Sequence, residues 1–394
     1  MDQNDIVIVA AKRTPMGAML GHLSALSAPE LGSVAHMAAI TQAGLTPADI
    51  DEVISGCVLQ AGIGQAPARQ AAINAGIPNS TGATTLNKMC GSGMKAVMLA
   101  HDLIKAGSAQ VILASGMESM SNAPYLLSKA RSGYRLGHGE LKDHMFLDGL
   151  EDAYDKGKLM GCFAEATAEH FKFSREQQDE FAIQSMTKAL NAIKDGSFVE
   201  EIAPVTLTTR KGDVTISTDE GPDEAKITKI PQLKAAFQAD GTVTAANSSS
   251  ISDGAASLIL MTAGQAEKRG ITPIARIVAH ASHAQAPQWF TTAPVDAIRK
   301  VMNRAEWSQN DVDLYEINEA FAVVTMAAIT QLELNPEQVN IHGGACALGH
   351  PIGASGARIL VTLIHALKST GKKRGIASLC IGGGEATAMA IELV

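Results

Sequence analysis

The sequence predicts an α/β protein built from two similar aliphatic halves, with a charged insertion between them. Hydrophobic residues make up 46% of the 394 residues and aromatic residues only 4%, which is typical of a globular protein with a large aliphatic core. Short apolar runs alternate with helical patterns through residues 1–120, as expected of α/β order. The same aliphatic, glycine-rich character returns after Thr242-Val243-Thr244 and continues to Val394.

The first half predicts its elements in a regular order. Ile6-Val7-Ile8-Val9-Ala10 is typical of a strand. Thr46-Pro47 favours a helix start, because it puts an N-cap residue before a proline at the first helical position. Residues 109–116 form an apolar run that ends in glycine and predicts a buried strand.

Residues 121–247 differ in composition from the rest of the chain. Charges are dense there, as in Glu151-Asp152-Ala153-Tyr154-Asp155-Lys156, so we expect an insertion with more exposed surface. Within it, Ser174-Arg175-Glu176-Gln177 has the spacing of a capping box and predicts the start of a helix.

The two aliphatic parts repeat each other. Cys90-Gly91-Ser92-Gly93-Met94-Lys95 aligns with Gly353-Ala354-Ser355-Gly356-Ala357-Arg358 at an offset of 263 residues. A mostly apolar helical stretch follows each segment, and a strand that ends in small residues follows each helix. Loop glycines could produce part of this similarity by chance, but the matching order of elements favours a duplicated α/β unit.

Charge and cysteine usage exclude several classes of protein. The formal net charge of −8 gives no electrostatic support for binding nucleic acid. No apolar run reaches about 18 residues without interruption, so we expect no membrane span, and no signal-peptide pattern follows Met1. The five cysteines include no C-x-x-C pair, which argues against a zinc or redox pair and favours free thiols in a reducing compartment. We therefore expect a cytoplasmic protein with no bound metal.

Four residues stand out as candidates for chemistry: Cys90, His350, Cys380 and Asn318. Cys90 lies in Asn87-Lys88-Met89-Cys90-Gly91-Ser92-Gly93, just before a helical stretch. At a helix N-terminus, unpaired backbone N–H groups and the helix dipole favour the reactive thiolate, so we expect a nucleophile there. The other three are flanked by small or apolar residues, as in loops where backbone approaches a ligand. Taken singly, each is more often an ordinary packed or loop residue than a catalytic one, and no P-loop or dinucleotide-binding fingerprint is present.

Together, these segments resemble the thiolase family over nearly the whole chain. The motifs that carry the resemblance are Ala11-Lys12-Arg13-Thr14-Pro15-Met16-Gly17, Gly241-Thr242-Val243-Thr244-Ala245, Asp253-Gly254-Ala255-Ala256, Asn318-Glu319-Ala320-Phe321, Gly343-Gly344 through Gly349-His350-Pro351-Ile352-Gly353-Ala354-Ser355-Gly356-Ala357-Arg358, and Cys380-Ile381-Gly382-Gly383-Gly384.

The resemblance implies a five-layer α-β-α-β-α fold made of two similar halves plus a loop domain. Residues 1–120 with 248–270 would form the N-terminal half, residues 121–247 the loop domain, and residues 271–394 the C-terminal half. Members of the family are dimers or tetramers, the latter built through the loop domain, and we expect a homotetramer.

The resemblance also implies the reaction, a reversible Claisen condensation of two acetyl-CoA molecules to acetoacetyl-CoA and CoA. Cys90 matches the nucleophile that becomes acylated, His350 the base that activates it, and Cys380 the second thiol, which moves the α-proton. One oxyanion hole would use His350 with a water held by Asn318, and the other the backbone N–H groups of Cys90 and Gly382. Coenzyme A thioesters are the substrates, and no further cofactor is implied.

For coenzyme A, the resemblance suggests contacts at Ser249, Ala320, Phe321 and Met160. The chain departs from the family's common pattern at Leu159 and at Asp223, where many short-chain members carry His and Arg. Lys226 or Lys229 could supply the missing positive charge.

The acyl-length preference and the exact activity leave alternatives open. Trp289-Phe290 falls where family members limit acyl length, so it either favours acetyl and acetoacetyl groups or simply packs a loop. Within the same fold, a thiolase for longer chains remains an alternative, whereas Cys380 speaks against a decarboxylating ketoacyl synthase. A non-catalytic acyl-CoA or lipid-binding protein would be expected to lose one of Cys90, His350 and Cys380.

Overall fold

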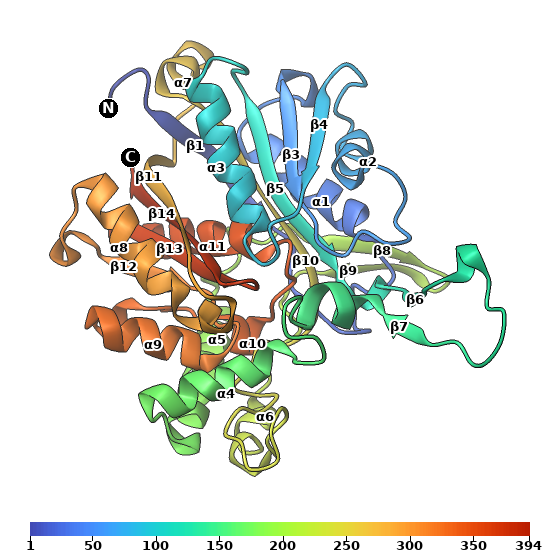
Figure 1. Ribbon diagram of the computed structural model, residues 1–394. Coiled ribbons are helices and arrows are strands. Elements are labelled where there is room, and N and C mark those ends of the chain that lie inside the picture. The colour runs from blue at the N-terminus through green and yellow to red at the C-terminus, as the bar shows by residue number, and fades with distance from the viewer.

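The computed structural model describes all residues 1–394 and shows two α/β halves that share one strand order (Figure 1). The strands of the first half run in the order β4 (Gly82–Leu86), β3 (Glu52–Gly56), β5 (Ile112–Ser119), β10 (Ser252–Thr262) and β1 (Ile6–Arg13). Those of the second half run in the order β12 (Leu314–Ile317), β13 (Arg374–Ile381), β14 (Glu385–Leu393) and β11 (Ala275–Ala284). In both halves one parallel pair is followed by two antiparallel pairs, so the duplicated unit predicted from the sequence is confirmed, with no counterpart of β4 in the second half. The two sheets are joined where β1 pairs with β11 over two residue pairs, and the short β2 (Gly17–Ala18) pairs with β10.

Helices cover both sheets and fill the space between them, which gives the five predicted layers. The helices of the layers are α1 (Ala28–Gln42) and α2 (Pro67–Asn74) outside the first sheet, α3 (Ser92–Lys105) and α11 (Ser355–Thr370) in the middle, and α8 (Ala293–Ala305) and α9 (Ala322–Leu332) outside the second sheet. Alternation along β1 shows why the layers form, because successive strand residues point to opposite faces. Ile6 and Ile8 pack into the middle layer, whereas Val7 and Val9 pack under α1.

The two middle helices touch at their N-terminal turns, and glycines make this possible. A Cβ on Gly93 would lie 2.7 Å from the backbone nitrogen of Ala357, and a Cβ on Gly356 would collide with Met94. The helices begin at Ser92 and Ser355, in agreement with the 263-residue offset.

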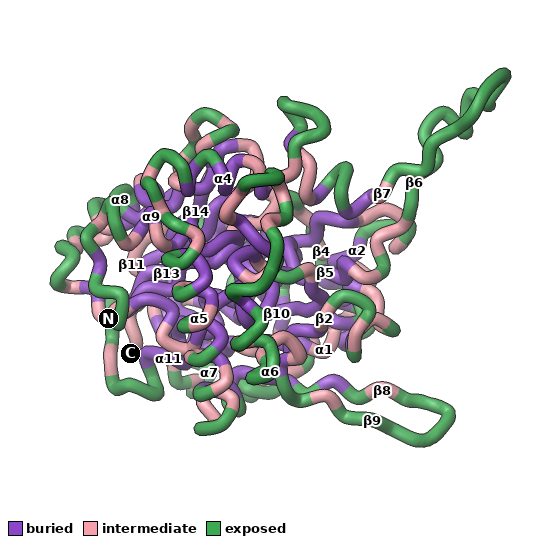
Figure 2. The backbone as a smooth tube through the Cα atoms, turned by 90° about the horizontal axis from the view of Figure 1, so that it is seen from below, coloured by how far each residue is buried: buried purple, intermediate pink, exposed green.

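The inserted segment lies against both halves and carries an exposed arm. Its elements are β6 (Tyr125–Leu127), β7 (Leu141–Asp143), α4 (Met160–Phe171), α5 (Arg175–Asp195), β8 (Val205–Thr209), β9 (Gly212–Ile216) and α6 (Glu224–Ile227). Figure 2 shows β6 and β7 at the base of an exposed arm that projects from the body. The insertion is anchored by the buried Arg13, which pairs with Glu201 and, at 2.6 and 2.9 Å, with both carboxylate oxygens of Asp219. The remaining helices are α7 (Ala263–Arg269) and α10 (Ala345–Leu348).

The predicted positions of individual helices and strands agree with the structure to different degrees. The capping box at Ser174 is confirmed, since its hydroxyl accepts from the backbone N–H of Gln177 at the start of α5. The helix start predicted at Thr46-Pro47 is present, with Thr46 as N-cap, but it opens only a three-residue 3-10 helix, Pro47–Asp49, because the chain enters β3 at Glu52. The strand expected over 109–116 is β5, which begins three residues later at Ile112 and runs to Ser119. None of the helices combines the length and apolar character needed to span a bilayer.

Candidate active site

A cavity of about 600 Å³ lies where the two halves and the insertion meet. Eight of the predicted site residues line it together: Cys90, Met160, Ser249, Phe290, Ala320, Phe321, His350 and Gly382. The other two, Asn318 and Cys380, are fully buried in its wall. Asn318 lies behind His350, and Cys380 packs with Phe290, Ala320 and Phe321.

Cys90 is held in a tight turn just before α3. Met89, directly before it, has a left-handed backbone with φ of +47°, which costs a residue with a Cβ about 1–3 kcal/mol. Ser92 holds this turn, since its hydroxyl accepts from Lys88 N–H at 2.8 Å and donates to Met89 O at 2.6 Å. The Lys88 ammonium pairs with Glu385 on β14, so the turn is tied to the second half. The thiol position is therefore fixed by the backbone of both halves.

The thiol of Cys90 is not ionised in the resting site. Burial raises its pKa to about 11, against hydrogen bonds from the backbone N–H groups of Gly382 and of Cys90 itself, which lower it. The negative charge of Glu118 adds to the increase. The expectation that the helix N-terminus favours the thiolate is therefore wrong, because desolvation outweighs the N–H groups. Those same two N–H groups nevertheless face the sulfur, where an acyl oxygen would develop charge.

His350 lines the cavity and has one unprotonated ring nitrogen. Its Nδ1 lies 2.5 Å from the hydroxyl of Ser355, and that hydroxyl donates its own hydrogen to Pro351 O at 3.0 Å. Ser355 must therefore accept, which puts the imidazole proton on Nδ1 and leaves a lone pair on Nε2. Nε2 is buried and has no hydrogen-bond partner. Burial, with help from the charge of Arg358, lowers the pKa of His350 to about 3, so the ring is neutral.

A buried polar chain fixes Asn318 behind this histidine. The Asn318 amide nitrogen lies 3.5 Å from His350 Nδ1, and its oxygen lies 3.4 Å from a guanidinium nitrogen of Arg358. Arg358 is in turn held by Glu316 at 2.9 Å. The donor face of the Asn318 amide is thus directed toward the histidine.

Cys380 is the penultimate residue of β13, just before a glycine turn. Gly383 and Gly384 have φ of +94° and +89°, a backbone that side chains disfavour, and they turn β13 into β14. Burial and the neighbouring Cys90 raise the pKa of Cys380 well above its ordinary value. The site therefore rests with two neutral thiols and one neutral imidazole.

Comparison with known proteins identifies the family. Its N-terminal and C-terminal domain profiles, described as thiolase, N-terminal domain, and thiolase, C-terminal domain, match residues 6–264 and 271–393. The chain belongs to the thiolase family. An acetyl-CoA acetyltransferase of Cupriavidus necator is 49% identical over 98% of this chain and 99% of its own, and acetyl-CoA acetyltransferase 2 of Arabidopsis thaliana is 48% identical over 100% and 98%. The crystal structure of the Bacillus anthracis acetyl-CoA acetyltransferase matches with a TM-score of 0.97 at 42% identity and 99% coverage of both chains.

In this thiolase, some of the residues suggested from the sequence for acyl-length control and for binding the charged end of coenzyme A lie outside the cavity. Phe290 is buried in the cavity wall, but Trp289 lies in a separate surface groove against the ring of His170. Lys226 and Lys229 are exposed and do not line the cavity, and Lys226 is hydrogen-bonded to Gly221 O. Asp223 caps α6 by accepting from Ala225 N–H. The structure thus leaves no lysine of this stretch in the thiolase cavity.

Two further parts of the thiolase site were not predicted from the sequence. The segment 146–154 covers one side of the cavity and includes Phe146, Leu147 and Tyr154; its only signal was an apolar pair within a charged region. Glu118 was missed altogether. It is buried beside Cys57, its charge acts on Cys90, and its carboxylate accepts from Val58, Leu59 and Gly353 N–H groups. Burial raises its pKa to about 7, against those three donors. Glu118 thereby joins the Cys90 half to the loop that carries His350.

Proposed function

We propose that this thiolase is an acetyl-CoA C-acetyltransferase that reversibly joins two acetyl-CoA molecules into acetoacetyl-CoA and CoA. One observation carries the proposal: the sulfur of Cys90 receives two backbone N–H groups, and the same cavity is lined by His350, whose Nε2 has no hydrogen-bond partner. The names of the full-length relatives support the choice of acetyl-CoA.

In the first step, the Cys90 sulfur attacks the carbonyl carbon of acetyl-CoA while its proton passes to His350 Nε2. Because the resting pair is neutral, the proton moves together with carbon–sulfur bond formation rather than before it. The N–H groups of Cys90 and Gly382 bind the oxyanion. The intermediate then expels CoA, whose sulfur takes the proton from His350, and leaves acetyl-Cys90.

In the second step, Cys380 moves a proton at the α-carbon of the second acetyl-CoA. For condensation, His350 Nε2 would take the thiol proton of Cys380, and the resulting thiolate removes the α-proton. The Nε2–H of His350 and a water held by Asn318 would then stabilise the enolate oxygen. The enolate attacks acetyl-Cys90 to form acetoacetyl-CoA, and the departing Cys90 sulfur takes the proton back from His350. In thiolysis the thiol form returns a proton to the leaving enolate. Because burial raises the pKa of Cys380, its resting form is the one that thiolysis needs.

The residues in the cavity wall favour a short acyl group at one end and a place for coenzyme A along the rest of the cavity. Phe290, buried beside Cys380, closes the acyl end and limits chain length. Met160, Ser249, Ala320 and Phe321 would contact the pantetheine arm, since they line the same cavity. No residue role in this scheme calls for a metal or a further cofactor.

We also propose a homotetramer assembled through the β6–β7 arm. The arm exposes apolar side chains that gain by burial, and Leu136 is 99% exposed. Light scattering of the full chain should give four copies, and substitution of Leu136 and Leu141 by Ser should give a smaller assembly.

Mass spectrometry after mixing with acetyl-CoA tests the proposed function. We expect an added acetyl group that disappears in Cys90→Ala, and label that persists in the variant would refute the assignment. Rates of thiolysis decide the substrate: a preference for a medium-chain 3-ketoacyl-CoA over acetoacetyl-CoA would favour a degradative thiolase for longer chains. Absence of any acyl-enzyme and of any turnover would favour a binding protein.

A further inference from the structure

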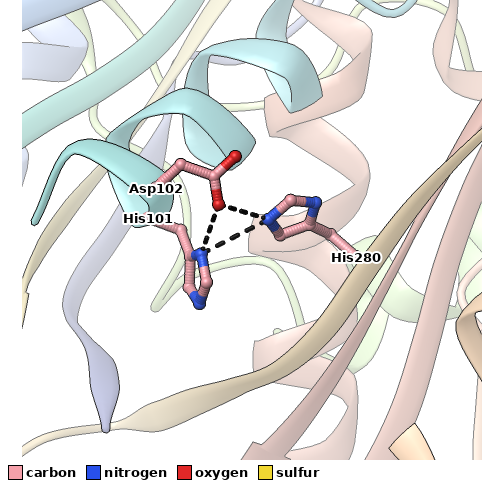
Figure 3. A group of neighbouring side chains, drawn as sticks. All are labelled: His101, Asp102 and His280. Atoms are coloured by element: carbon pink, nitrogen blue, oxygen red, sulfur yellow. Dashed lines mark hydrogen bonds and ion pairs between the residues drawn. The ribbon is translucent and has the colours of Figure 1, made fainter. Parts of the chain in front are cut away.

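Three potential metal ligands meet outside the active site, on the border between the two halves (Figure 3). His101 and Asp102 lie on α3 of the first half, and His280 lies on β11 of the second. Figure 3 shows the three side chains turned toward one another. Nothing in the sequence spacing predicts this group, because His280 is 178 residues from Asp102.

The donor atoms form a nearly equilateral triangle. Asp102 Oδ1 lies 2.9 Å from His101 Nδ1 and 2.9 Å from His280 Nε2, and the two nitrogens are 3.3 Å apart. Bonds of about 2.0–2.2 Å to a metal place neighbouring ligands about 2.9–3.5 Å apart in octahedral and tetrahedral sites. The triangle therefore already has the size that one ion requires.

Two features argue against a chance meeting of surface side chains. Neighbouring residues on a helix point in different directions, yet His101 and Asp102 converge on the ring of His280. Both histidine side chains are mostly buried, with 17% and 14% of their surface exposed, whereas 53% of the Asp102 side chain is exposed. The site is thus fixed on two sides and open to solvent on the third.

The charges around the group suit a divalent cation. Asp102 Oδ1 accepts hydrogen bonds from both imidazole rings, which places a carboxylate oxygen between two nitrogen ligands. Of the surrounding cations, Lys95 acts on His280 through its charge, and Arg304 is bonded to His280 O at 2.6 Å. These positive charges will weaken binding without removing the ligands.

We propose that His101 Nδ1, Asp102 Oδ1 and His280 Nε2 form a zinc site that ties α3 to β11, with water in the fourth position. Two imidazoles and one carboxylate are a common ligand set for zinc. On binding, the proton of each neutral ring moves from the ligand nitrogen to the other ring nitrogen, His101 Nε2 or His280 Nδ1. The rings stay neutral, and no proton is released. Because α3 begins directly after Cys90, the ion would clamp the helix that positions the nucleophile.

Titration of the full chain with zinc chloride tests the site. The protein should carry Cys90→Ser, so that the active-site thiol does not compete for the metal. Calorimetry should give one zinc ion per chain, and cobalt(II) should give the visible absorption bands of a site with nitrogen and oxygen ligands. The melting temperature should rise with zinc and return to its starting value when a chelator is added.

Two ligand variants and one matched control decide the outcome. His280→Gln and Asp102→Asn should each weaken zinc binding at least about tenfold, whereas His283→Gln, on the same strand and paired with Asp296, should not. If His280→Gln does not fold, Asp102→Asn decides alone, since its half-exposed side chain tolerates the change. Zinc binding that survives Asp102→Asn, or no binding by the parent chain, would overturn the proposal. None of these outcomes depends on the acyl transfer proposed above.

Discussion

Ser355→Ala should slow acylation of Cys90 by about 10–100-fold while leaving the fold intact. Ser355 is the only hydroxyl bonded to His350 Nδ1, at 2.5 Å, and it sets which ring nitrogen carries the proton. Without it, the nearest group is the Asn318 amide nitrogen at 3.5 Å, a donor that favours an unprotonated Nδ1. The proton then moves to Nε2, where it blocks acceptance of the Cys90 proton.

The size of the effect follows from the lost hydrogen bond. Leaving the buried Nδ1–H without its acceptor costs about 1–3 kcal/mol, and this is the penalty for keeping the reactive tautomer. Since each 1.36 kcal/mol is tenfold in rate, acylation slows by about one to two orders of magnitude. Binding of acetyl-CoA involves neither atom, so KM should change little while the acylation rate falls.

Quenched-flow mass spectrometry of acetyl-Cys90 measures this rate directly. Ser115→Ala is the matched control, because Ser115 is also buried and bonded to a histidine, His36, at 3.0 Å, but lies outside the cavity. The control should lose similar stability and keep the acylation rate. If Ser355→Ala acylates as fast as the parent chain, the tautomer argument is refuted.

Four other perturbations test separate parts of the structure. Alkylation of Cys90 by iodoacetamide should accelerate about tenfold per unit between about pH 7 and about pH 9, because its pKa of about 11 leaves the thiolate a minor form throughout; a plateau in this range would contradict the neutral thiol. Cys380→Ser should keep acetyl-Cys90 formation, seen by mass spectrometry, and lose thiolysis and condensation, whereas loss of acylation too would put Cys380 in the first step. Phe290→Ala should raise kcat/KM for medium-chain relative to acetoacetyl substrates about tenfold and cost about 3–5 kcal/mol in urea unfolding; an unchanged ratio would remove Phe290 as the length limit. Arg13→Ala should destabilise the chain by about 3–5 kcal/mol because it leaves two buried carboxylates unpaired. Arg276→Ala, which breaks a partly exposed pair with Glu392, should cost under about 1 kcal/mol; equal effects would contradict the anchoring role of Arg13.

Much of the fold could be predicted from the sequence, because close packing between the halves requires the small residues that make the repeat visible. Glycine is required at Gly93 and Gly356, where the two middle helices touch. Each glycine is therefore the second residue of its helix, and the two helices begin 263 residues apart, as the sequence repeat predicts. Local boundaries were less accessible. An N-cap such as Thr46 marks where a helix begins but not how long it is. Here the helix ends after three residues because β3 must begin at Glu52 to pair with β4 and β5.

The sequence was enough to predict which residues make up the site, but not whether their side chains are ionised. Motif resemblance collected Cys90, His350 and Gly382, which do meet in one cavity. The ionisation of Cys90 was predicted wrongly, because a local helix argument does not include the desolvation that the tertiary fold imposes. Glu118 escaped notice for a related reason, since its partner Gly353 N–H comes from 235 residues away.

The duplication explains why the reaction centre lies where it does. Each half contributes the N-terminal turn of one buried helix, and the contact of Gly93 with Ala357 brings the two turns together. Cys90 precedes one turn and His350 the other, so two helix dipoles direct their positive ends at one region. At rest, desolvation raises the pKa of Cys90 to about 11 even though two backbone N–H groups lower it, so the thiol stays neutral. The field of the two helices acts instead on the oxyanion and the enolate, whose charge develops only during the reaction, so the same helix termini can stabilise the transition state without trapping a stable thiolate.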